Sequence, residues 1–143
     1  DGLPTMFSYK THAEGNSLYN TPPVFAIYIM GLVMKWLESN GGIAAMEKAN
    51  KEKAAILFER LDKSEFYKPT VPREDRSLMN VTFRLPTEDL EKKFIKETEA
   101  KGFSGLKGHR SVGGCRASIY NAFPKEGIVR LVEFMDAFEK ANK

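Results

Sequence analysis

The segment Leu78–Leu85, "LMNVTFRL", gives the clearest indication of the fold. Apolar side chains occupy every second position: Met79, Val81, Phe83 and Leu85. The positions between them carry the polar side chains of Asn80, Thr82 and Arg84. Successive side chains of a strand point to opposite faces of a sheet. The alternation therefore predicts a β-strand that buries one of its faces.

The sequence around this strand predicts helices and one further strand. Four elements are expected: helices over 43–62, 88–101 and 125–141, and a strand over 115–120. Thr87 is suited to cap the second of these helices, and Gly102 to end it. Residues 43–143 therefore predict a small two-layer α/β domain, in which helices pack on a small sheet.

Residues 1–42 have a different character. The first 19 residues show no sustained period and predict an irregular arm. A long helix is expected over 22–39, after Asn20 and Thr21 as its natural capping residues. This helix is apolar on nearly every side, so it must be buried all round. We expect a partner chain or a further domain to cover it, and residues 1–42 to belong to a larger domain or to an interdomain link.

Composition narrows the class of protein. The chain has 143 residues, of which 42% are hydrophobic and 29% charged, and a net charge of +3. Its basic residues are mixed with acidic ones, whereas nucleic-acid-binding proteins usually gather them on one face. Cys115 is the single cysteine, and His12 and His109 lack metal-binding spacing, so no disulfide or metal site is expected. With no visible signal peptide, and an apolar run shorter than the roughly 18–20 residues of a membrane span, a cytoplasmic chain is expected.

The segment Leu106–Phe123, "LKGHRSVGGCRASIYNAF", holds the candidate binding residues. His109, Arg110 and Arg116 lie close together around a Gly-Gly pair, and two guanidinium forks suit a ligand with two anionic ends. The glycines would let backbone and ligand approach closely. The alternative is a solvated loop in which Arg116 pairs with an acidic residue of the fold. Cys115 lies in register with core residues, which favours a buried, inert thiol over a nucleophile.

Three segments resemble the phosphoserine aminotransferase family, a group of pyridoxal-phosphate enzymes of fold type I. They are "SLYNTPPVFAIYIMGLVMKWLESNGGI", "RSLMNVTFRL" and "LKGHRSVGGCRASIYNAFPKEGIVRLVEFM". The resemblance covers essentially all 143 residues and is to the C-terminal part of the family. It implies the family's small domain, with a mainly antiparallel sheet, over 43–143, preceded by an arm and an interface helix of the large domain.

The resemblance also implies roles for individual residues. Asn20 and Thr21 would bind the phosphate of the cofactor across a homodimer interface. Arg116 would bind the α-carboxylate of the substrate. His109 and Arg110 would bind its phosphate, or the side-chain carboxylate of glutamate in the same site. From spacing alone, plain helix capping by Asn20 and Thr21 is favoured over anion binding, since Pro22 and Pro23 remove two amide donors.

The implied reaction belongs to serine biosynthesis. The intact enzyme would transfer an amino group between L-glutamate and 3-phosphohydroxypyruvate, giving 2-oxoglutarate and phosphoserine. The lysine that forms the Schiff base with pyridoxal phosphate would lie upstream of this chain, so no lysine here is assigned as catalytic. We therefore expect a fragment that is inactive alone. The alternative function is a free-standing anion-binding or dimerisation module without catalysis.

Overall fold

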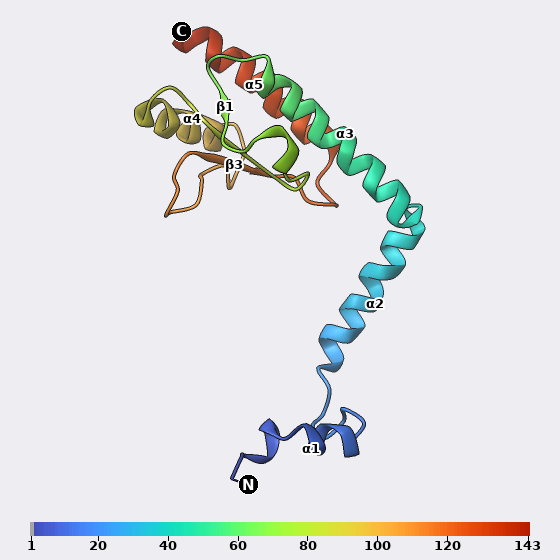
Figure 1. Ribbon diagram of the computed structural model, residues 1–143. Helices are drawn as coiled ribbons and strands as arrows, with labels where there is room; N and C mark the ends of the chain where they lie inside the picture. The colour runs from blue at the N-terminus through green and yellow to red at the C-terminus, as the bar shows by residue number, and fades with distance from the viewer. Residues whose placement is uncertain (1) are drawn as a thin grey trace. The chain divides into compact units, whose positions relative to one another are not determined.

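The computed structural model describes residues 2–143, which form two compact units (Figure 1). The first unit ends at Ile43, and the second comprises Ala44–Lys143. The division lies within one residue of the predicted boundary between 42 and 43.

The first unit is helical. It contains a 3₁₀ helix, η1 (Thr5–Phe7), and the helices α1 (Tyr9–Glu14) and α2 (Val24–Ser39). The predicted irregular arm thus includes two short helical segments. The predicted capping residues are wrong: Pro23 occupies the N-cap position of α2, and no side chain there caps the helix by a hydrogen bond. Two consecutive prolines hold the chain extended, because the residue before a proline avoids helical backbone angles. The helix therefore begins after both.

Helix α2 carries its apolar side chains on the surface of this chain. None of its residues is buried, and Phe25 is 77% exposed. The described residues thus do not bury this helix, and its cover by a partner chain or a further domain stays a prediction. At 16 residues α2 is also too short to count as a membrane-spanning helix, and none of the helices within 2–143 is long and apolar enough for that.

The second unit has an α/β fold. Its helices are α3 (Gly42–Asp62), α4 (Glu88–Ala100) and α5 (Lys125–Asn142), with a 3₁₀ turn, η2 (Arg73–Asp75). Its strands are β1 (Lys68–Pro69), β2 (Asn80–Arg84) and β3 (Cys115–Ser118). They form an antiparallel sheet in the order β1-β2-β3. The predicted alternation of helices and strands over 43–143 is confirmed, and β1 is an additional strand.

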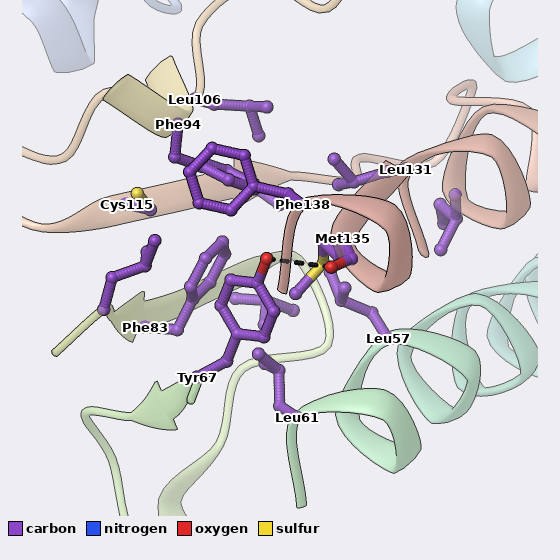
Figure 2. Packing of buried hydrophobic residues seen from close by; sticks show 14 of the residues in the cluster. Leu57, Leu61, Tyr67, Phe83, Phe94, Leu106, Cys115, Leu131, Met135 and Phe138 are labelled. Carbon is purple, nitrogen blue, oxygen red and sulfur yellow. Dashed lines mark hydrogen bonds between the residues drawn. The ribbon is translucent and has the colours of Figure 1, made fainter. Parts of the chain in front are cut away.

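The hydrophobic core lies between the sheet and the helices (Figure 2). Val81 and Phe83 of β2 are fully buried, as their alternation predicts, and they pair with Ala117 and Cys115 of β3. The Tyr67 hydroxyl donates a hydrogen bond to the carbonyl oxygen of Met135 at 3.0 Å. The predicted burial of Cys115 is confirmed, and burial raises the pKa of its thiol to about 12. A thiol with such a pKa is protonated at neutral pH and is a poor nucleophile.

An acidic side chain, Glu139 of α5, joins this helix to α3. Glu139 pairs with Arg60, accepts a hydrogen bond from Ser64 Oγ at 3.1 Å and contacts Lys143 Nζ at 2.6 Å. Burial raises the pKa of the Glu139 carboxyl, but the hydrogen bonds from Lys143, Arg60 and Ser64 and the charge of Arg60 outweigh it and lower this pKa to about 2. The native state therefore binds this proton more weakly than the unfolded chain does.

The lowered pKa of Glu139 predicts a loss of stability in acid. The carboxylate stabilises the native state above its ordinary pKa of 4.5, and this contribution is lost as the pH falls towards about 2. We expect urea unfolding of the Glu139→Gln variant to show a smaller free energy of unfolding at pH 7 and a weaker pH dependence between these values. Glu133→Gln, at an exposed position of the same helix, is the control. An unchanged pH dependence in Glu139→Gln would contradict this account.

Candidate functional site

The candidate site is built on a hairpin that runs from Leu106 to Arg116. The Gly108 amide donates to the carbonyl oxygen of Gly114, and the Arg116 amide to that of Leu106, both at 2.8 Å. These bonds pair 106–108 with the start of β3, whose other edge pairs with β2. The segment between the paired strands carries His109 and Arg110, so the sheet itself supports these two side chains.

Glycines are required for the hairpin to close. A Cβ atom at Gly108 would lie far inside van der Waals distance of the carbonyl oxygen of Gly113. Gly113 and Gly114 have φ angles of +76° and +70°, a region that residues with a side chain rarely adopt. The sequence predicted that these glycines admit a ligand. In the structure, Gly108 admits the opposite strand of the hairpin, and Gly113 and Gly114 admit the Arg84 side chain, while the close approach of a ligand stays a prediction.

The close approach at Gly108 gives a testable expectation. Gly108→Ala should force the hairpin apart and displace His109, and we expect about a tenfold or larger loss of affinity for L-phosphoserine in the intact protein. Lys101→Ala is the control, because Lys101 is exposed and lies outside the hairpin. Calorimetric titration measures both variants. Equal affinities in the two would show that the hairpin geometry is unimportant for binding.

Arg84 braces the hairpin from β2. Its Nη1 atom lies 3.2 Å from Glu91 Oε2 of α4, and its Nη2 atom donates to the carbonyl oxygen of Val112. The side chain also packs against Gly113 and Gly114, where any Cβ would meet it. The alternating pattern of the sequence assigns Arg84 to the polar face of its strand and indicates no partner for it. The pairing with Glu91 could have been suspected, since acidic residues are typical of the first turns of a helix.

His109 presents a proton donor to solvent. Its Nδ1 atom accepts a hydrogen bond from the Ser111 amide at 3.3 Å and lies 2.7 Å from Ser111 Oγ. A backbone amide can only donate, so Nδ1 carries no proton and the neutral ring holds its proton on Nε2. The ring and the neighbouring Arg110 are both exposed. Nε2–H and the guanidinium are therefore free to bind an anion.

His109 and Arg110 line a cavity of about 360 Å³. The charged side chains in its wall are Arg84, Glu88, Glu91, Lys92, Lys107 and Arg110. Basic groups outnumber acidic ones, and Glu91 is already paired with Arg84. The excess of positive charge in the cavity wall therefore favours an anionic ligand.

Arg116 lines a second cavity, of about 550 Å³, which shares no lining residue with the first. Its wall includes Ser118, Tyr120 and Arg130, and no acidic residue among those described lines it. The Nε atom of Arg116 is buried and has no hydrogen-bond partner within residues 2–143. The alternative interpretation, an Arg116 paired with an acidic residue of this fold, is therefore wrong for the described part of the chain. His109 and Arg110 are brought together, and Arg116 lies apart from them.

Asn20 and Thr21 belong to the first unit, and both are exposed. Within residues 2–143 the side-chain amide of Asn20 makes one long contact, to Met6 Sδ at 3.7 Å, so both side chains retain donors for a ligand. Among residues 2–143, no group of three or more His, Cys, Asp or Glu side chains could hold a metal ion.

Comparison with known proteins identifies the family. The aminotransferase class-V family model matches residues 4–131. The chain belongs to the class-V aminotransferases. Its hairpin, with His109, Arg110 and Arg116, lies within the matched region. The predicted resemblance to phosphoserine aminotransferases is confirmed by individual relatives of that name.

Two curated relatives are phosphoserine aminotransferases of Desulfosudis oleivorans and Geobacillus kaustophilus, which are 60% and 59% identical over 142 and 141 residues. These matches cover 99% and 98% of the chain and 39% of each relative. The structure of phosphoserine aminotransferase from Bacillus circulans subsp. alkalophilus matches with a TM-score of 0.91 and 51% identity, over 99% of this chain and 39% of that one. The structure of the pyridoxal-phosphate-bound phosphoserine aminotransferase from Trichomonas vaginalis matches with a TM-score of 0.83 and 40% identity. This match covers 94% of this chain and 39% of that one.

The class-V aminotransferase chain thus spans about 39% of the length of the relatives it matches. This share agrees with the expectation of a fragment. The matches do not support the predicted position at the C-terminal end of the relatives. The α/β fold with a small antiparallel sheet resembles the matched 39% of the Bacillus circulans structure.

Proposed function

We propose that this chain is part of an enzyme that transfers an amino group between L-glutamate and 3-phosphohydroxypyruvate, giving 2-oxoglutarate and phosphoserine. The observation that carries the proposal is the hairpin with its three anion-binding groups, His109, Arg110 and Arg116, in a chain up to 60% identical to phosphoserine aminotransferases. Phosphoserine and glutamate both carry anionic groups at their two ends. Two separate cationic cavities suit such molecules better than one cluster would.

Each binding group has a role that follows from its chemistry. Arg116 would bind the α-carboxylate, because a planar guanidinium matches the two oxygens of a carboxylate. Its buried, unpartnered Nε atom supports this role, since such a donor is costly until an acceptor arrives. His109 Nε2–H and Arg110 would bind the phosphate of phosphoserine or the side-chain carboxylate of glutamate. Both are exposed, and within residues 2–143 neither forms an ion pair, while Glu91 of the same cavity is paired with Arg84.

Pyridoxal phosphate is the cofactor that the family and a related structure imply. When bound, it supplies the electron sink that amino-group transfer requires. We propose that Asn20 and Thr21 hold its phosphate, because their exposed amide and hydroxyl groups are donors of the type phosphate accepts. We assign none of the lysines of this chain as the residue that holds the cofactor covalently. That lysine would be supplied from outside these 143 residues, and we expect the chain alone to be inactive.

A homodimer is part of the same proposal. The exposed apolar residues of α2 include Phe25, Ile27 and Tyr28, and a soluble chain rarely leaves so large an apolar surface uncovered. A second copy of the protein would cover it, next to Asn20 and Thr21 at the start of the helix. The enzyme would act in serine biosynthesis in the cytoplasm.

The proposal is tested with the intact protein, of which this chain is part, purified with pyridoxal phosphate. Incubation with L-glutamate and 3-phosphohydroxypyruvate should give phosphoserine and 2-oxoglutarate in equal amounts. Hydroxypyruvate, which lacks the phosphate, should react at least about a hundredfold less efficiently, because it cannot form the charge-assisted hydrogen bonds that His109 and Arg110 would make with the phosphate. Binding of phosphoserine without amino-group transfer would identify a binding module instead. Equal use of both keto acids would overturn the roles of His109 and Arg110.

A further inference from the structure

A buried lysine on α3 has no role in the site described so far. Lys53 is 3% exposed, and none of the ion pairs found in the described part of the chain includes it. Its Nζ atom contacts four backbone carbonyl oxygens: those of Tyr120 at 2.7 Å, Asn121 and Phe123 at 3.2 Å, and Ile119 at 3.3 Å. All four belong to the loop that joins β3 to α5.

The four carbonyl groups replace a carboxylate partner. An ammonium has three donors and can satisfy three of these oxygens directly, while the fourth shares a donor. Burial lowers the pKa of Lys53, because taking an ammonium out of water disfavours its charged form. Four carbonyl dipoles that converge on one point would repel one another without a cation between them. The loop conformation and the buried charge therefore depend on each other.

Helix α3 binds the same loop at a second point. Asn50, one turn before Lys53, donates from Nδ2 to Asn121 Oδ1 at 2.8 Å. The two contacts join positions that are 66 to 71 residues apart in the sequence. Because both come from one face of α3, the helix fixes the loop in two places and leaves little freedom for it to shift.

The fixed loop forms one wall of the cavity that Arg116 lines. Ile119, Tyr120 and Phe123 all belong to that wall, and the loop directly continues the strand on which Arg116 lies. We propose that Lys53 is a positioning residue, whose ammonium holds the loop 119–123 in place and thereby shapes the carboxylate-binding cavity around Arg116. The proposal rests on the proposed function, because it assigns the cavity to the substrate carboxylate.

The test compares variants of the intact protein. Lys53→Met keeps most of the length of the side chain and removes its charge. Lys53→Ala leaves room for propylammonium, which replaces the missing stem and ammonium. Lys51→Met and Lys51→Ala are the matched controls, since Lys51 lies on the same helix, is exposed and pairs with Glu47. Hydrogen exchange of the peptide that spans 116–124 reports the loop, and titration with L-phosphoserine reports the cavity.

We expect Lys53→Met to speed exchange in 116–124 and to weaken phosphoserine binding about tenfold or more, a size typical of small displacements in a binding site. Propylammonium should restore both in Lys53→Ala and change nothing in the Lys51 variants. If Lys53 only stabilised the fold, its replacement would lower the unfolding midpoint but leave phosphoserine binding and exchange in 116–124 unchanged in the folded protein. That result would overturn the proposal. If Lys53→Met fails to fold, the rescue of Lys53→Ala decides alone.

The outcomes separate this proposal from the function on which it rests. A wild-type protein that does not bind phosphoserine would overturn the proposed function. The position of the loop would then still be judged by hydrogen exchange. Binding by the wild-type protein, together with unchanged exchange and binding in both Lys53 variants, would overturn the role of Lys53 alone.

Discussion

Replacing Arg116 by lysine in the intact protein is expected to reduce kcat/KM for L-glutamate and for phosphoserine by about a hundredfold. Lysine keeps the positive charge but loses the planar fork that matches both carboxylate oxygens. The loss should be similar for both substrates, because both carry the same α-carboxylate. Steady-state kinetics in the two directions of the reaction measure it.

A control separates the local effect from a general one. Arg73→Lys changes an arginine whose side chain is 79% exposed and pairs with Asp62, so kcat/KM should stay close to the wild-type value. If Arg116→Lys lowered kcat/KM for only one of the two substrates, Arg116 would bind a group that the substrates do not share, and its assignment to the α-carboxylate would be wrong.

Replacing Phe94 by alanine is expected to destabilise the protein by about 3–5 kcal/mol. Phe94 is fully buried on α4, and its ring lies within 5.1–6.0 Å, centroid to centroid, of four aromatic rings: those of Tyr67, Phe83, Phe134 and Phe138. The substitution removes these edge contacts and leaves a cavity between the sheet and the helices. Urea unfolding, followed by circular dichroism, measures the change in the free energy of unfolding.

Phe94→Leu is the matched variant, because it keeps most of the apolar volume and loses only the aromatic contacts. We expect it to cost about 1–2 kcal/mol. Equal losses in the two variants would show that the ring contacts, and not the filled volume, carry the stability. A loss below about 1 kcal/mol in Phe94→Ala would place the core elsewhere.

Local patterns in the sequence were sufficient for the main elements of the second unit. The alternation around Val81 and Phe83 predicted β2 and its buried face, because a period of two has no other simple explanation. Thr87 caps α4 as predicted, and its side chain accepts a hydrogen bond from the Leu90 amide at 3.2 Å. By contrast, β1 has only two residues, one of them Pro69, and is too short to show any period.

Contacts between distant segments were beyond the reach of these patterns. In the sequence, Lys53 is one of many charged residues mixed along a helical segment, and only the fold shows that its ammonium is buried against a loop 66 to 70 residues away. The separation of Arg116 from His109 and Arg110 into two cavities has the same origin, because their closeness in sequence says nothing about which cavity each side chain lines. The start of α2 depended on two adjacent prolines, whose combined effect outweighed the capping preference of Thr21.

The most direct test of the proposed site is a crystal structure of the intact protein with L-phosphoserine bound. The account predicts that the phosphate oxygens lie within hydrogen-bonding distance of His109 Nε2 and the Arg110 guanidinium, and that Arg116 contacts the α-carboxylate through two of its nitrogens. Phosphoserine bound with its phosphate away from the hairpin, or with Arg116 still unpartnered, would contradict it.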